Sequence, residues 1–75
     1  MKEMKKYERI RNLREDKDLT QKQIAEQLYV TQKTYSRYEN GDHAIPTEIL
    51  ISISNIHGVS VDYILGLTNN PKRVY

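Results

Sequence analysis

Five polar side chains between residues 31 and 40 have the spacing of one helix face. At about 100° per residue they spread over one side, and Tyr35 and Tyr38 fall on the other. Glutamine can form two hydrogen bonds with adenine, and arginine or lysine can bond O6 and N7 of guanine. None of the five is acidic, so the pattern predicts a surface for base edges and phosphates. The face consists of Gln32, Lys33, Ser36, Arg37 and Asn40.

Two charged residues fall where inward-facing side chains are expected. Arg14 continues an apolar stripe with Tyr7, Ile10 and Leu13, and Glu39 lies at the margin between the polar face and the tyrosines. An inward charge is costly unless it is paired and hydrogen-bonded. We therefore predict a partly buried ion pair that orients the helix with the polar face and removes an acid from that face. The alternative is two separate surface charges.

Start and stop signals predict five helices and no strand. A capping box, Thr20 with Gln23, opens the second helix, and Thr31 is the N-cap of the third. Glycines that can take a left-handed conformation end the third and fourth helices. The predicted helices run from about Met4 to Lys17, from Thr20 to Leu28, from Thr31 to Asn40, from Pro46-Thr47 up to Gly58, and from Ser60 to about Leu65.

Together these residues resemble the helix-turn-helix of the Cro and phage-repressor (Xre) family. The resemblance covers roughly residues 7 to 70, and it implies a compact all-α, five-helix, lambda-repressor-like DNA-binding domain with the helix-turn-helix at its second and third helices. The matching segments are Leu19-Thr20-Gln21, Ile24-Ala25, Leu28, Thr31-Gln32, Ser36-Arg37-Tyr38-Glu39-Asn40-Gly41, Pro46 and Val59-Ser60-Val61-Asp62-Tyr63-Ile64-Leu65-Gly66.

The resemblance also implies roles for individual residues. Base-reading positions match Gln32, Lys33 and Arg37. Phosphate-holding positions match Gln21, Thr31 and Asn40, and we add Ser36 from its place on the polar face. Arg14 and Glu39 match the buried salt bridge of the family. Tyr29 stands where a glycine is common, so the turn is strained if this residue has a positive φ. Ser54 stands for a frequent alanine, a change that should leave the packing intact.

Composition argues against catalysis, metal binding and export. The chain has 75 residues and no cysteine, so it can hold one small core and no disulfide or thiolate metal site. His43 and His57 lack partners for a metal shell, and with Glu48 and Asp62 they form no evident acid-base constellation. We expect no enzyme and no cofactor. The charged start leads into no apolar segment, so we expect a soluble cytoplasmic protein.

The expected partner is double-stranded DNA. Residues 1–17 carry seven Lys/Arg against four Asp/Glu, whereas residues 41–67 carry three acids and no Lys/Arg. We expect a transcriptional regulator in which residues 1–67 form the domain and residues 68–75 a flexible tail. We favour a repressor, although the choice between repressor and activator depends on where the operator lies relative to a promoter. We also expect a homodimer on a pseudo-palindromic operator, through the last helix and Ile64, Leu65 and Leu67. The alternative is an adaptor or antitoxin-like module whose protein partner occupies the acidic C-terminal half.

Overall fold

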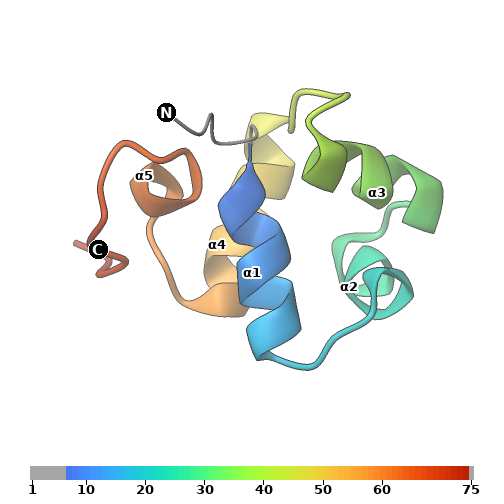
Figure 1. Ribbon diagram of the computed structural model, residues 1–75, viewed down its shortest axis with the longest axis horizontal. Coiled ribbons are helices and arrows are strands. Elements are labelled where there is room, and N and C mark those ends of the chain that lie inside the picture. The colour runs from blue at the N-terminus through green and yellow to red at the C-terminus, as the bar shows by residue number, and fades with distance from the viewer. Residues whose placement is uncertain (1–6, 75) are drawn as a thin grey trace, which may run out of the picture.

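The computed structural model describes residues 7–74, and this part of the chain is all-helical. It contains α1 (Glu8–Asp16), α2 (Gln21–Leu28), α3 (Gln32–Asn40), α4 (Thr47–His57) and α5 (Val61–Ile64), with no strand between residues 7 and 74. The predicted five-helix fold is therefore confirmed. In Figure 1, α1 lies across the centre, α2 and α3 lie at one end, and α5 with the C-terminal segment lies at the other. Within residues 7–74, no helix is long and apolar enough to span a membrane.

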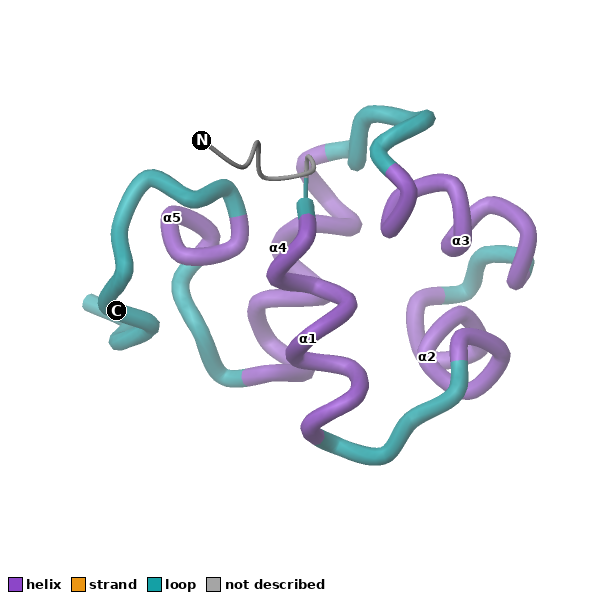
Figure 2. Tube along the Cα trace, in the orientation of Figure 1, coloured by secondary structure: helices purple, strands orange, loops and turns teal. Residues whose placement is uncertain are grey.

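Local hydrogen bonds explain where three of the helices begin. The Thr20 hydroxyl accepts from the amide of Gln23 at 3.1 Å, and the Thr20 amide donates to Gln23 Oε1 at 2.8 Å, which completes the predicted capping box. The hydroxyl of Thr31 likewise caps α3, and that of Ser60 caps α5. These bonds satisfy amides that have no partner within their own helix. These caps therefore fix where the loops before α2, α3 and α5, drawn in teal in Figure 2, come to an end.

The first helix begins later than its periodicity predicts. Tyr7 has φ 61 and ψ 24, a left-handed conformation, so α1 starts at Glu8 and the prediction of a helix through Tyr7 is wrong. The predicted start at Met4 lies outside the described residues. The conformation has a tertiary contact beside it: the amide of Ile45 donates to Tyr7 Oη at 3.3 Å. A contact 38 residues away in sequence is invisible to helical periodicity.

The core lies between α1 and the other helices, and aromatic side chains fill much of it. Tyr35 and Tyr38 are buried with their rings edge to face, 6.4 Å apart at 86°, and Tyr7 and Tyr63 pack against the same cluster. All four tyrosines therefore contribute to the core. Among residues 7–74, the remaining buried apolar side chains are Ile10, Ile24, Ala25, Leu28, Ile45, Ile53, Val59 and Ile64.

One predicted interface residue belongs to this core. Ile64 is 2% exposed, so it packs inside its own chain and is not available to a partner. The prediction that Ile64 lines a dimer interface is therefore wrong. Leu65 and Leu67, predicted with it, are exposed. A four-residue helix buries one side chain and exposes its neighbour because successive residues lie about 100° apart around its axis.

An arginine of α1 holds the C-terminal segment against the helices. Arg9 Nη1 donates to the carbonyl oxygens of Tyr63, at 2.8 Å, and of Thr68, and Arg9 Nη2 donates to Asn69 Oδ1 at 2.6 Å. The same guanidinium lies 4.2 Å from the centroid of the Tyr63 ring. Further along, the amide of Ser60 donates to the carbonyl of Pro71 at 3.0 Å. Thr68, Asn69 and Pro71 thus have defined contacts with the helical part of the chain, and the flexibility expected for the tail stays a prediction.

Candidate nucleic-acid interface

Helices α2 and α3 pack together through a tight turn centred on Tyr29. The amides of Tyr29 and Val30 donate back to the carbonyls of Glu26 and Ala25, which ends α2 before Thr31 caps α3. Tyr29 has φ 59 and its side chain is 95% exposed. A non-glycine residue in this conformation costs about 1 to 2 kcal/mol, and the exposed ring gains little from packing. The positive φ therefore strains the turn, as the sequence predicts for a tyrosine at a position where glycine is common.

The polar face of α3 borders an open hollow that α2 completes. Six of the seven residues predicted to contact DNA line this hollow, together with Asp42. Gln21 comes from the first turn of α2, and the others come from α3 or the loop after it. The fold thus brings Gln21 of α2 and Asp42 of the following loop beside the polar residues of α3, which helical spacing alone groups together. The lining residues are Gln21, Gln32, Lys33, Ser36, Arg37, Asn40 and Asp42.

Thr31 is the predicted contact residue that does not line the hollow. Its hydroxyl accepts from the amide of Thr34 at 3.1 Å and donates to Thr34 Oγ1 at 2.9 Å. The side chain is exposed at the N-terminus of α3. The Thr31 hydroxyl therefore acts as both donor and acceptor within the cap of α3 in the free protein.

Arg14 and Glu39 join α1 to α3 directly beneath this surface. Arg14 Nε lies 2.6 Å from Glu39 Oε2 and Nη2 lies 3.2 Å from Oε1, while the two side chains are only 13% and 3% exposed. Arg14 Nη1 also donates to the carbonyl of Leu19 at 2.7 Å. This two-point contact fixes the orientation of both planar groups. The structure thus brings together Arg14 of the inward stripe and Glu39 at the margin of the polar face, the two charges that the sequence predicts to pair.

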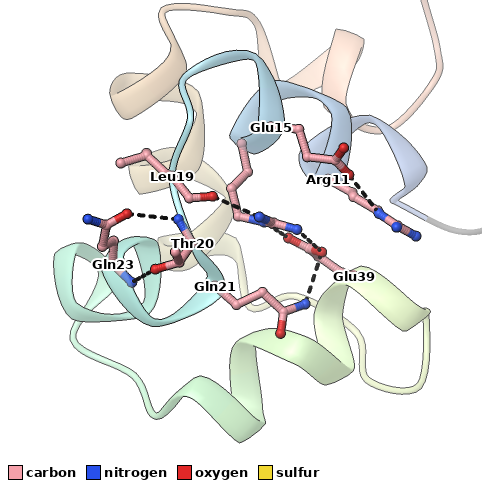
Figure 3. Close-up of polar contacts among 8 residues, drawn as sticks. Arg11, Glu15, Leu19, Thr20, Gln21, Gln23 and Glu39 are labelled. Atoms are coloured by element: carbon pink, nitrogen blue, oxygen red, sulfur yellow. Dashed lines mark hydrogen bonds and ion pairs between the residues drawn. The ribbon is translucent and has the colours of Figure 1, made fainter.

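Gln21 connects the ion pair to the hollow. Its Nε2 donates to Glu39 Oε1 at 3.1 Å, as Figure 3 shows, so one end of the amide is held by the buried carboxylate. Burial opposes ionisation of Glu39, but the Arg14 guanidinium, the Tyr35 hydroxyl and the Gln21 amide together outweigh it and lower the pKa of Glu39. The hydrogen bond to Glu39 raises the pKa of Arg14. The buried pair therefore stays ionised, and Arg14 neutralises the negative charge of Glu39 close to the polar face.

Two residues after α3 belong to the site although sequence reasoning did not assign them to it. Gly41 has φ 79 and reverses the chain, so the amides of Asp42 and His43 donate to the carbonyl of Arg37 at 2.9 and 3.3 Å. Asp42 then lines the hollow, and His43 Nε2 lies 3.1 Å from Arg37 Nη1. The Asn40-Gly41 stop signal could have revealed this, because a left-handed cap returns the next residues to the last helical turn.

Comparison with known proteins agrees with this arrangement. A family description, helix-turn-helix, matches residues 10–64, which include α2, the Tyr29 turn and α3. The chain belongs to the helix-turn-helix family. The resemblance to Xre-type helix-turn-helix domains inferred from the motif residues is thereby confirmed.

Named relatives of this helix-turn-helix chain are bacterial. It is 39% identical over 64 residues to the HTH-type transcriptional regulator YobD of Bacillus subtilis, covering 85% of this chain and 57% of YobD. It is 41% identical over 58 residues to the HTH-type transcriptional activator BcrR of Enterococcus faecalis, covering 77% of this chain and 28% of BcrR. The chain thus spans little more than half of YobD and a smaller part of BcrR.

A solved structure extends the likeness to three dimensions. The crystal structure of the clp gene regulator ClgR from C. glutamicum superposes with a TM-score of 0.68 at 31% sequence identity. The match covers 77% of this chain and 75% of that chain. Most of the chain therefore has a counterpart in an experimentally determined fold.

Proposed function

We propose that this helix-turn-helix domain binds double-stranded DNA sequence-specifically and regulates transcription. The observation that carries the proposal is the hollow beside α3, because six side chains suited to bases and phosphates converge there. Two of them, Lys33 and Arg37, are cations, whereas Glu39, the one acid of α3, is buried against Arg14, which leaves Asp42 as the one acid among the described residues of the lining. The names of the relatives, which are transcriptional regulators, support the same function.

Helix α3 enters the major groove in the proposed complex, and α2 crosses the phosphate backbone. Gln32, Lys33 and Arg37 read base edges. The first turn of α2 faces a phosphate, since its free amides and the helix dipole favour an anion there. The residues proposed to hold the sugar-phosphate backbone are Gln21, Thr31, Ser36 and Asn40.

Dimerisation follows from the size of the reading surface. One helix reads only a few base pairs, so a specific operator requires two copies on half-sites roughly 34 Å apart. Leu65 and Leu67 are large, exposed apolar side chains next to α5, and we place them in the interface between copies. Such a dimer covering a promoter acts as a repressor, and we place it in the cytoplasm, where the DNA is.

Selection of bound fragments from random double-stranded DNA tests the proposal. We expect a pseudo-palindromic consensus, and an affinity for it that falls steeply with added salt because phosphate contacts release counterions. A scrambled sequence of equal length is the control and should bind far more weakly. If no consensus emerges and binding stays weak and indifferent to sequence, the DNA-reading function is refuted and the adaptor alternative is favoured.

A further inference from the structure

The loop that follows α3 places an imidazole against the side chain of Arg37. His43 Nε2 lies 3.1 Å from Arg37 Nη1, and both residues are exposed on the side of the molecule that carries the hollow. The position of His43 is constrained by its own backbone, since its amide and that of Asp42 both donate to the Arg37 carbonyl. Main chain and side chain of residue 43 thus both contact Arg37.

The chemistry of the two groups fixes the direction of this bond. A guanidinium only donates, so Nε2 of His43 must accept, and the neutral imidazole carries its proton on Nδ1. The bond occupies one donor of Nη1. Within residues 7–74, the structure shows no other hydrogen bond of the Arg37 side chain, so the edge formed by Nε and Nη2 stays available. That edge has the fork geometry that bonds O6 and N7 of guanine.

We propose that His43 is a positioning residue that holds the Arg37 guanidinium ready to read a guanine in the major groove. This inference rests on the proposed function, in which Arg37 contacts a base. An arginine side chain has many rotamers in solution, and a second contact that selects one of them reduces the ordering required on binding. His43 therefore sharpens the preference for guanine at one base pair without touching the DNA base itself.

Base discrimination measured on matched DNA duplexes tests the proposal. One duplex carries the selected operator, and the others carry each substitution of the base pair whose preference disappears in Arg37→Ala. The specificity ratio is the affinity for the operator divided by that for the substituted duplex. We expect His43→Ala to lower this ratio about three- to tenfold, the range of one net hydrogen bond. His43→Gln should keep most of the ratio, because its Oε1 can accept from Arg37 in place of Nε2.

His57→Gln is the matched control, since it replaces the other histidine at the far end of α4, and it should leave the ratio unchanged. The proposal is overturned if His43→Ala keeps the parental ratio, or if His43→Gln loses as much as His43→Ala. An Arg37→Ala variant that retains every base preference refutes the base-reading role of Arg37, and the role of His43 with it. The two results for His43 would leave the proposed DNA-reading function intact, so failure of the His43 proposal is distinguishable from failure of the base-reading role of Arg37.

Discussion

Replacing Glu39 by glutamine removes one charge from the buried pair and leaves the shape of the side chain almost unchanged. Arg14 keeps its bond to the Leu19 carbonyl and can still donate to the glutamine oxygen, but its charge loses the carboxylate that lay 2.6 Å away. With Glu39 3% and Arg14 13% exposed, water replaces little of that interaction. Breaking a buried pair costs about 3 to 5 kcal/mol. Because Arg14 retains some contact with solvent, we expect a loss of about 3 kcal/mol in the free energy of unfolding.

Denaturant-induced unfolding followed by circular dichroism measures this loss. The control is Glu15→Gln on α1, where the Arg11–Glu15 pair has a similar distance, 2.8 Å, but side chains that are 62% and 54% exposed. We expect this control to lose less than about 0.5 kcal/mol, since exposed pairs separated by four residues contribute little. Equal, small losses in both variants would refute the reasoning that burial makes the Arg14–Glu39 pair structural.

The same pair predicts a pH dependence. The pKa of Glu39 is lowered in the folded protein, so the unfolded chain binds the proton more readily. The stability contributed by ionised Glu39 is fully present above the ordinary value of 4.5 and declines as the pH falls below it. The stability difference between the parent and Glu39→Gln should therefore narrow below that pH. A difference that stays constant down to about pH 3 would contradict the lowered pKa.

Three further changes test other local features. Thr20→Ala removes the hydroxyl that caps α2 and should lower the free energy of unfolding by about 1 kcal/mol, whereas an unchanged denaturation midpoint would argue against the capping box. Tyr29→Gly relieves the left-handed strain at an exposed position and should raise stability by about 0.5 to 1 kcal/mol; a loss of stability would show that the ring packs in solution. Burial, aided by the charge of Lys17, lowers the pKa of His57, so the stability that neutral His57 contributes should be present above about pH 6.5 and decline below it. His57→Gln should remove this part of the decline, and identical pH profiles of stability in both proteins would exclude a contribution from His57.

Much of the fold is predictable because its start and stop signals are local. The hydroxyl caps at Thr20 and Thr31 and the glycine ends at Gly41 and Gly58 each act within a few residues, so the sequence places these helix ends directly. Tyr7 shows the limit of this reasoning. Its left-handed conformation accompanies contacts with a distant loop, which no local pattern encodes.

The site was predictable in part for the same reason. Helical spacing identifies the polar face of α3, and the inward positions of Arg14 and Glu39 suggest that they meet. Spacing does not reveal that Gln21 also bonds Glu39, since that contact depends on how α2 packs against α3. The contribution of His43 is likewise missed, because it depends on the chain reversing at Gly41 rather than on periodicity.

Titration of the selected operator with the parent, Lys33→Ala and Arg37→Ala tests the central claim most directly. Both side chains are exposed in the hollow, so their removal should leave the unfolding transition unchanged. We predict that each substitution weakens operator binding by about 1 to 3 kcal/mol, with Arg37→Ala also relaxing the preference at one base pair. Operator affinity equal to that of the parent in both folded variants would contradict the assignment of this surface to DNA.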